Sequence, residues 1–253
     1  MDKWKLALKE FLKEYEEDDD VIGAILCGSY ANYTYNEYSD IDVVLVLKDN
    51  LNYTEKGISN VQSFMIEYFK LPIKTIKRYF KDNFDNKKLT MINMFAYGKI
   101  IYDIEGKVKE LQDIALDYID RPMEVISNYD LSFNNYRIWD NLDELKVLLN
   151  ENSMSFNIVY YNLLWKVYES YCLYLGIPIY PRTKLYKILT DNDYRKKYHA
   201  FKLPEDEFID LYLRCYNEVR KEEMFKNISC LVNYYYTKQG GFNIRTFYLR
   251  REF

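Results

Sequence analysis

The most informative stretch of this sequence is Leu26-Cys27-Gly28-Ser29-Tyr30, and ten residues separate its Ser29 from Asp40-Ile41-Asp42-Val43. Residues 21–27 form an apolar run that ends at the Gly-Ser pair, which predicts a buried strand followed by a turn. Residues 41–47 form a second, β-branched run, which predicts another strand. A glycine at the turn lets a ligand approach the backbone, and free N–H groups beside the Ser29 hydroxyl would suit an anion, with phosphate as the best candidate.

Carboxylates gather around the second predicted strand. Asp40 and Asp42 are two residues apart, so an extended backbone places both side chains on one face, with Cα atoms roughly 6.5–7 Å apart. Glu67 interrupts the apolar run Phe64 to Phe69, where a charge is costly unless it is paired or bound to metal. Carboxylates that share one space repel each other unless a cation lies between them, and hard oxygen ligands beside a phosphate favour Mg²⁺. Each feature alone also has a structural explanation: a solvated turn for the aspartates, or a charge that protects a sheet edge for Glu67.

Along the rest of the chain, the pattern of apolar residues predicts two domains. Up to about residue 120 it predicts a mixed sheet with helices, in the order helix 3–17, strands 21–27, 41–47, 61–69 and 99–102, and helix 107–119. Pro122 breaks the pattern, and long amphipathic helices follow at about 123–150, 154–175, 205–220 and 222–238. The helix at 154–175 is apolar around most of its circumference and should be the centre of a bundle. We therefore expect an α+β chain with domains at 1–120 and 121–253.

Composition excludes several classes of protein. The chain has 253 residues, of which 49% are hydrophobic and 29% charged, and its 8 Gly and 5 Pro exclude collagen-like and low-complexity classes. It has no apolar run near the roughly 20 residues that span a bilayer, and its N-terminus does not resemble a signal peptide, so we expect a cytoplasmic protein without membrane association. Four scattered cysteines are expected to be reduced, and a single His excludes a multi-histidine metal site.

Charge is distributed unevenly between the two predicted domains. Residues 1–120 hold 16 Lys and Arg against 22 Asp and Glu, a net charge of −6, whereas residues 121–253 hold 19 against 17, a net charge of +2. A nucleic-acid surface needs concentrated positive charge, so a polynucleotide partner is disfavoured. An acidic first half suits a divalent cation or a cationic small molecule, or is simply solvated surface.

The sequence resembles the nucleotidyltransferase superfamily with the DNA polymerase β-like fold. Gly28-Ser29, Ser39-Asp40-Ile41-Asp42-Val43 and Ile66-Glu67-Tyr68 match the superfamily's pattern in order and spacing, and Gly98 to Asp103 resembles the last strand and turn of that domain. With a helical second half, the chain looks most like small bacterial antibiotic nucleotidyltransferases, which act on aminoglycosides or lincosamides. One departure is Asn32-Tyr33, where relatives often have Arg-Gly; it removes a cation near the nucleotide.

The resemblance implies a two-metal nucleotidyl transfer. Gly28, Ser29 and Ser39 would hold the phosphates of ATP or another nucleoside triphosphate. Asp40 and Asp42 would bridge two Mg²⁺ ions. Glu67 would be a third metal ligand, the general base, or both.

The helical half is expected to supply the acceptor pocket and some cations. On the central helix, Lys166 lies in a polar stripe with Asn162 and Glu169, so it is a candidate phosphate contact. Lys184 and Lys187, with Arg182, follow Pro181 and are alternative contacts. A satisfied polar stripe or a surface ion pair is the favoured explanation of the first group. The 28 tyrosines could form a stacking platform for a base, although packing also accounts for them.

Three functions remain open from the sequence. The first is a Mg²⁺-dependent enzyme that moves AMP from ATP to a hydroxyl of a small acceptor such as an aminoglycoside or lincosamide, which would confer antibiotic resistance. The second is a protein- or tRNA-modifying nucleotidyltransferase of toxin–antitoxin type. The third is a non-catalytic, nucleotide-binding regulatory protein. The sequence does not identify the acceptor or the nucleobase of the nucleotide. It also leaves the oligomeric state open, with a homo-oligomer as one alternative.

Overall fold

The structure is a computed structural model that describes residues 2–250, and these residues form two compact units. The first unit runs to Pro122 and also includes Asp191–Ala200; the second consists of Met123–Thr190 and the chain from Phe201 onward. The boundary expected after residue 120 lies two residues before the observed one. The structure differs on residues 191–200, which the sequence-based division had placed in the second domain.

A five-stranded mixed sheet forms the centre of the first unit, which confirms the predicted α+β class. Its strands lie in the order β3-β4-β2-β1-β5, where β2 and β4 are parallel and the other neighbours antiparallel. Their bounds are β1 Val21–Cys27, β2 Ile41–Leu47, β3 Glu55–Val61, β4 Phe64–Pro72 and β5 Lys99–Asp103. The predicted strand at 61–69 corresponds to β4. Strand β3, which the sequence analysis missed, is polar and mostly exposed.

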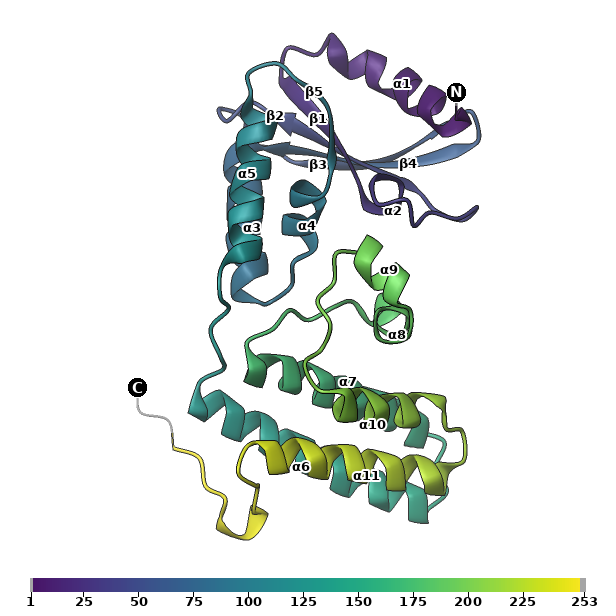
Figure 1. Cartoon of the computed structure of the whole chain (residues 1–253), viewed down its shortest axis with the longest axis vertical. Coiled ribbons are helices and arrows are strands. Elements are labelled where there is room, and N and C mark those ends of the chain that lie inside the picture. The colour runs from purple at the N-terminus through teal and green to yellow at the C-terminus, as the bar shows by residue number, and fades with distance from the viewer. Residues whose placement is uncertain (1, 251–253) are drawn as a thin grey trace. The chain divides into compact units, whose positions relative to one another are not determined.

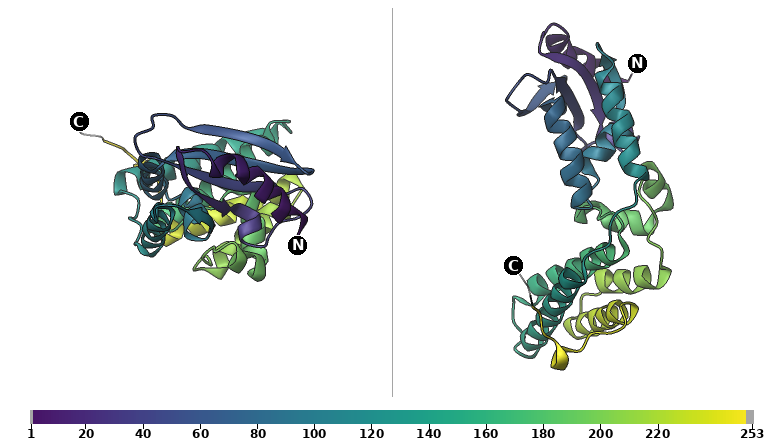
Figure 2. Two further views of the ribbon diagram at one scale, coloured as in Figure 1. Left: turned by 90° about the horizontal axis from the view of Figure 1, so that it is seen from above. Right: turned by 90° about the vertical axis from the view of Figure 1, so that its left-hand side faces the viewer.

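Helices cover both faces of this sheet (Figure 1). Helix α1 (Lys3–Glu16) packs on one face, in one apolar cluster with Ile41, Val43, Leu45 and Leu47 of β2. On the other face lie α3 (Ile73–Asp85), α4 (Thr90–Ala96) and α5 (Lys107–Asp120), and α3 and α5 run side by side in Figure 2. Because side chains alternate along a strand, Asp42 points to the face opposite α1.

The second unit is a helical bundle, as the sequence predicted. Its helices are α6 (Asn128–Asn150), α7 (Phe156–Leu175), α8 (Arg182–Thr190), α10 (Asp206–Asn217) and α11 (Lys221–Lys238), followed by a 3₁₀ turn at Ile244–Thr246. Helix α7 contributes a large share of the apolar core and contacts both α6 and α11. Helix α9 (Asn192–Lys197) belongs to the first unit.

Tyrosine hydroxyls satisfy polar groups inside the bundle, which accounts for part of the tyrosine content by packing. The buried Tyr160 hydroxyl donates to the carbonyl oxygen of Cys215 at 2.8 Å, and the Tyr168 hydroxyl accepts from the backbone N–H of Tyr180 at 3.0 Å. Buried backbone groups need such partners, because an unpaired one costs about 1–3 kcal/mol. A tyrosine thus fills the core and also supplies the missing hydrogen bond.

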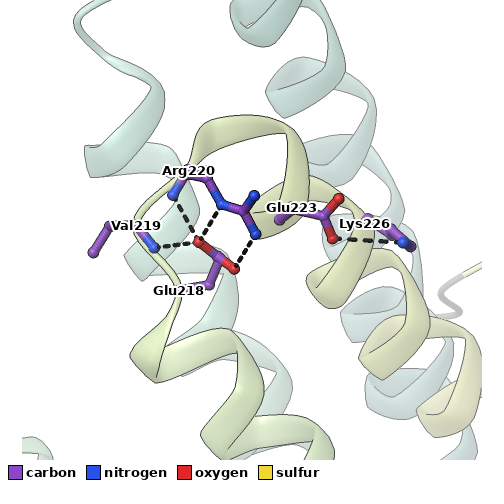
Figure 3. Close-up of polar contacts among 5 residues, drawn as sticks. All are labelled: Glu218, Val219, Arg220, Glu223 and Lys226. Carbon is purple, nitrogen blue, oxygen red and sulfur yellow. Dashed lines mark hydrogen bonds and ion pairs between the residues drawn. The ribbon is translucent and has the colours of Figure 1, made fainter.

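The turn between α10 and α11 is held by one carboxylate (Figure 3). Glu218 accepts hydrogen bonds from the backbone N–H groups of Val219 and Arg220 at 2.9 and 3.0 Å, and from the Arg220 guanidinium at 3.3 Å. The guanidinium and backbone bonds lower the pKa of Glu218 to about 2. Glu218 is therefore ionised at neutral pH and continues to accept the hydrogen bonds of this turn.

Two further expectations concern the cysteines and the membrane. Among residues 2–250 the cysteines are free thiols, with Cys27, Cys172 and Cys215 buried and Cys230 exposed. In the same part of the chain, no helix combines the length and the apolar character needed to cross a bilayer.

Candidate functional site

The turn from β1 into the short helix α2 (Gly28–Ala31) brings Gly28 against Asp42. Gly28 has φ +62°, a left-handed conformation that residues with side chains rarely adopt. A Cβ atom built on Gly28 would lie 1.9 Å from Oδ2 of Asp42, closer than any real contact. The glycine is thus required both by the backbone and by the carboxylate that lies beside it.

Asp42 and Glu67 are direct neighbours across two parallel strands. The register of β2 and β4 pairs Asp42 with Glu67, and the register of β1 and β2 pairs Cys27 with Asp42. Neighbours in register point to the same face of a sheet. In this structure Glu67 forms an ion pair with Lys56 of β3, with 2.7 Å between Nζ and Oε1. The side chain of Glu67 therefore leaves the sheet on the same face as that of Asp42, and its carboxylate is directed toward the edge strand β3.

The other predicted residues of the first unit lie in the connection that precedes β2. Asp40 is exposed, and its charge adds to burial in raising the pKa of Tyr30. The Ser39 hydroxyl accepts from the backbone N–H of Asn36 at 2.9 Å, so it belongs to a local turn. Ser29 lies in the first turn of α2, where backbone N–H groups have no partner within the helix.

The donor set fits a hard divalent cation in its chemistry but is not gathered into a complete cluster. Carboxylate oxygens are the ligands that Mg²⁺ prefers, and Asp42 and Glu67 supply them from adjacent strands. Within residues 2–250, however, no group of three or more His, Cys, Asp or Glu side chains is arranged to hold a metal ion. The Glu67 carboxylate is instead paired with Lys56 in this structure.

A pocket of about 190 Å³ opens beside Asp42 and Gly28 within the first unit. The other residues that line it are Asn32, three residues of α4 and one from the segment Asp191–Ala200, namely Thr90, Asn93, Met94 and Tyr198. Its lining has one carboxylate and no Lys or Arg. The pocket therefore suits neutral or cationic groups better than a bare anion.

The sequence analysis missed four residues of this pocket, of which Asn93 and Tyr198 carry polar groups of note. Asn93 has a buried Oδ1 without a hydrogen-bond partner among the described residues, and it interrupts an apolar run just as Glu67 does, so the same signal could have found it. Tyr198 is half-buried, and burial raises its pKa to about 12, which keeps its hydroxyl protonated. The next residue, His199, stacks on Tyr97 with ring centroids 3.7 Å apart. No local sequence pattern predicts Tyr198 as a pocket residue, because it reaches the pocket only through the tertiary packing of the segment Asp191–Ala200 in the first unit.

Cys27, although adjacent to the site, is placed for packing. Its thiol donates to the carbonyl oxygen of Met94 at 3.3 Å, which joins β1 to α4. Burial raises the pKa of the Cys27 thiol well above its usual range, and the charge of Asp42 adds to the effect. The thiol is therefore protonated at neutral pH and is no candidate nucleophile.

The predicted cationic contacts Lys166, Lys184 and Lys187 lie in the second unit. Lys166 is on α7, where burial and the nearby charge of Arg137 lower its pKa. Lys184 and Lys187 are on α8. Their proposed contact with phosphate stays a prediction.

Comparison with known proteins gives three similarities. A family model described as a nucleotidyltransferase domain matches residues 8–126. A relative in Methanocaldococcus jannaschii, named "Putative protein adenylyltransferase", is 36% identical over 90 residues, an alignment that covers 30% of this chain and 91% of that protein. The crystal structure of a nucleotidyltransferase-like protein from Exiguobacterium sibiricum matches with a TM-score of 0.48 and 10% identity, covering 93% of this chain and 75% of that one.

Proposed function

Since this chain belongs to the nucleotidyltransferase superfamily, we propose that it is an enzyme that moves AMP from ATP to a hydroxyl group of an acceptor, with Mg²⁺ as the cofactor. In this reaction the acceptor oxygen forms a bond to the α-phosphorus. The bond from that phosphorus to the oxygen bridging to the β-phosphate breaks, and pyrophosphate leaves with the electron pair. The hydroxyl proton passes to a carboxylate of the site, for which Glu67 is the candidate.

The proposal gives each residue a role that its position supports. Gly28 and Ser29 offer backbone N–H groups and a hydroxyl at the first turn of α2, which suits phosphate oxygens. Asp40 and Asp42 would hold Mg²⁺, and Glu67 would join them or receive the proton. When bound, Mg²⁺ would neutralise phosphate charge and lower the pKa of the acceptor hydroxyl. Most of the rate enhancement would come from positioning and from charge stabilisation.

The observation that carries this proposal is the contact between Gly28 and Asp42. A glycine that cannot be replaced without striking the Asp42 carboxylate joins the turn that offers phosphate donors to the strand that offers metal ligands. The register that pairs Asp42 with Glu67 supports the same site from the other side.

Two classes of acceptor are candidates, each favoured by a different observation. The pocket beside Asp42 has one acidic residue and no basic one, and the first 120 residues carry a net charge of −6, which favours a small cationic acceptor with hydroxyl groups, such as an aminoglycoside. The name of the relative in M. jannaschii favours a protein hydroxyl instead. The acidity that suits the first class also disfavours tRNA.

Two measurements test the proposal. ATP with Mg²⁺ should stabilise the wild-type chain against heat by about 2.7 kcal/mol at a ligand concentration of 100 Kd. The double variant Asp40→Asn with Asp42→Asn should lose this gain, whereas Asp19→Asn, an exposed carboxylate of the same unit, should keep it. An equal gain in the double variant would show that the metal site is elsewhere.

The acceptor is then sought with ATP labelled at the α-phosphate. The chain is incubated with aminoglycosides, lincosamides, tRNA and a cell lysate, and each fraction is examined for label. Label on one class identifies the acceptor. Bound nucleotide without transfer to any fraction would instead favour the non-catalytic, regulatory function.

A further inference from the structure

A second pocket lies wholly within the helical unit, and nothing in the proposed reaction requires it. It has a volume of about 300 Å³, at the lower end of the range for small-molecule sites. Three helices line it: α7 with Tyr161, Leu164 and Trp165, α8 with Arg182 and Leu185, and α10 with Tyr212 and Tyr216.

The residues that line the pocket are mostly apolar at its base and aromatic at its rim. Leu164 and Leu185 are 2% exposed and Tyr212 is 4% exposed, so they form a closed base. Tyr161 and Tyr216 are each 43% exposed, which leaves large aromatic surfaces in water beside the opening. Exposed aromatic faces around an apolar base favour a flat ring as the occupant, because rings stack on rings at little cost in conformational entropy.

One positive charge stands at this pocket without an acidic partner. The Arg182 guanidinium lies over the Trp165 ring, with 4.8 Å between its central carbon and the ring centroid. Along residues 2–250, no carboxylate lies within 4.0 Å of Arg182, whereas Lys202, Arg220, Lys226 and Lys238 of the same unit each have such a partner. Stacking fixes the plane of a guanidinium and leaves its N–H edge available to a carboxylate or phosphate.

The same positive charge reaches the base of the pocket. Burial raises the pKa of Tyr212, and the charge of Arg182 opposes that rise. Arg182 thus lies close to both the base and the aromatic wall. No Asp or Glu lines the pocket, so a cationic ligand would find no counter-charge.

We infer that the helical unit contains a second ligand site, which binds a planar ring carrying one anionic group between Trp165, Tyr216 and Arg182. The ring stacks on the aromatic side chains, and the anionic group takes the N–H edge of the guanidinium. A nucleoside monophosphate and an aromatic carboxylic acid share this chemistry. The site is independent of the proposed transfer reaction, because it uses none of the residues around Asp42.

The test measures binding to the full chain by calorimetry in the presence of EDTA, which removes divalent cations from the carboxylate site. The probes are AMP and indole-3-acetate, with adenosine as a ring without charge and inorganic phosphate as a charge without a ring. We expect AMP or indole-3-acetate to bind at least tenfold more tightly than adenosine and phosphate. The probe that binds distinguishes a nucleotide from an aromatic acid.

Variants then locate the site. Arg182→Gln and Tyr216→Leu should each weaken binding about tenfold or more, a loss of about 1.4 kcal/mol. Both residues are exposed, so folding should be retained, and a melting curve of each variant checks this. Arg214→Gln, an exposed arginine of α10 outside the pocket, and Asp42→Asn in the first unit should bind as the wild type does. Absence of binding for both ring-containing anions, an unchanged affinity in Arg182→Gln, or a loss in Asp42→Asn would each overturn the inference.

Discussion

Replacing Gly28 by alanine separates the conformational role of this glycine from its contact with Asp42. At φ +62° an alanine costs about 1–2 kcal/mol of folding stability. Its Cβ would in addition lie 1.9 Å from Oδ2 of Asp42, whereas ordinary contacts begin near 3.4 Å. The carboxylate must therefore move by more than 1 Å, and a displacement of that size at a reacting centre can reduce the rate about 100-fold.

Gly106→Ala is the matched control. Gly106 also has a left-handed backbone, with φ +72°, but a Cβ there meets nothing within 4 Å. Gly28→Ala should lose at least as much stability as Gly106→Ala, and each kcal/mol corresponds to about 2–4 °C in Tm in a chain of this length. Only Gly28→Ala should lose the stabilisation by ATP and Mg²⁺ and most of the transfer of label.

The result that refutes this reasoning is a Gly28→Ala variant that keeps wild-type transfer and nucleotide-induced stabilisation. Asp42 would then tolerate displacement, and it could not be a metal ligand in the proposed site. A loss of activity in both glycine variants would also contradict it, because backbone strain at either turn would then be sufficient.

Three further predictions concern other parts of the chain. Tyr198→Ala should raise KM for the acceptor or nucleotide more than it lowers kcat, since Tyr198 lines the pocket without a charge to contribute; steady-state kinetics check this. Tyr160→Phe should lower the free energy of unfolding by about 1 kcal/mol in a denaturant titration, because the carbonyl of Cys215 loses its buried donor. Burial acts to raise the pKa of Glu205, but hydrogen bonds from Lys238 and two tyrosines outweigh burial, so the pKa is lowered. The contribution of Glu205 to the free energy of unfolding is therefore complete above about pH 4.5 and is lost as the pH falls through the folded-state pKa. Glu205→Gln should flatten that part of the pH–stability curve.

Elements with a strong hydrophobic pattern could be predicted from the sequence. Strands β1 and β2 and helices α1 and α7 bury long apolar runs or stripes, and their bounds agree with prediction to within two residues. Strand β3 was missed because it is an exposed edge whose polar residues carry no pattern; it exists because β4 provides hydrogen-bond partners along its length. Tertiary pairing determined this strand.

The candidate site divides in a similar way. The short separation of Asp40 from Asp42, and the Gly-Ser pair before them, are local, so extended geometry alone predicted a shared face. The family resemblance alone implied that Glu67 belongs to the same site as Asp42, and the structure pairs the two residues across parallel strands. The ion pair that directs Glu67 toward Lys56 could not be predicted, because it depends on which strand lies at the edge.

On its own, then, the order of residues determined the two-part layout, the acidic strand and the glycine turn, since each depends on neighbours along the chain. Only the folded chain decided that the turn touches Asp42, that a segment from the second half returns to bring Tyr198 to this pocket, and that Arg182 meets an aromatic wall in the bundle. These contacts join residues far apart in the chain. Their formation depends on the packing of whole helices and strands, which no local pattern encodes.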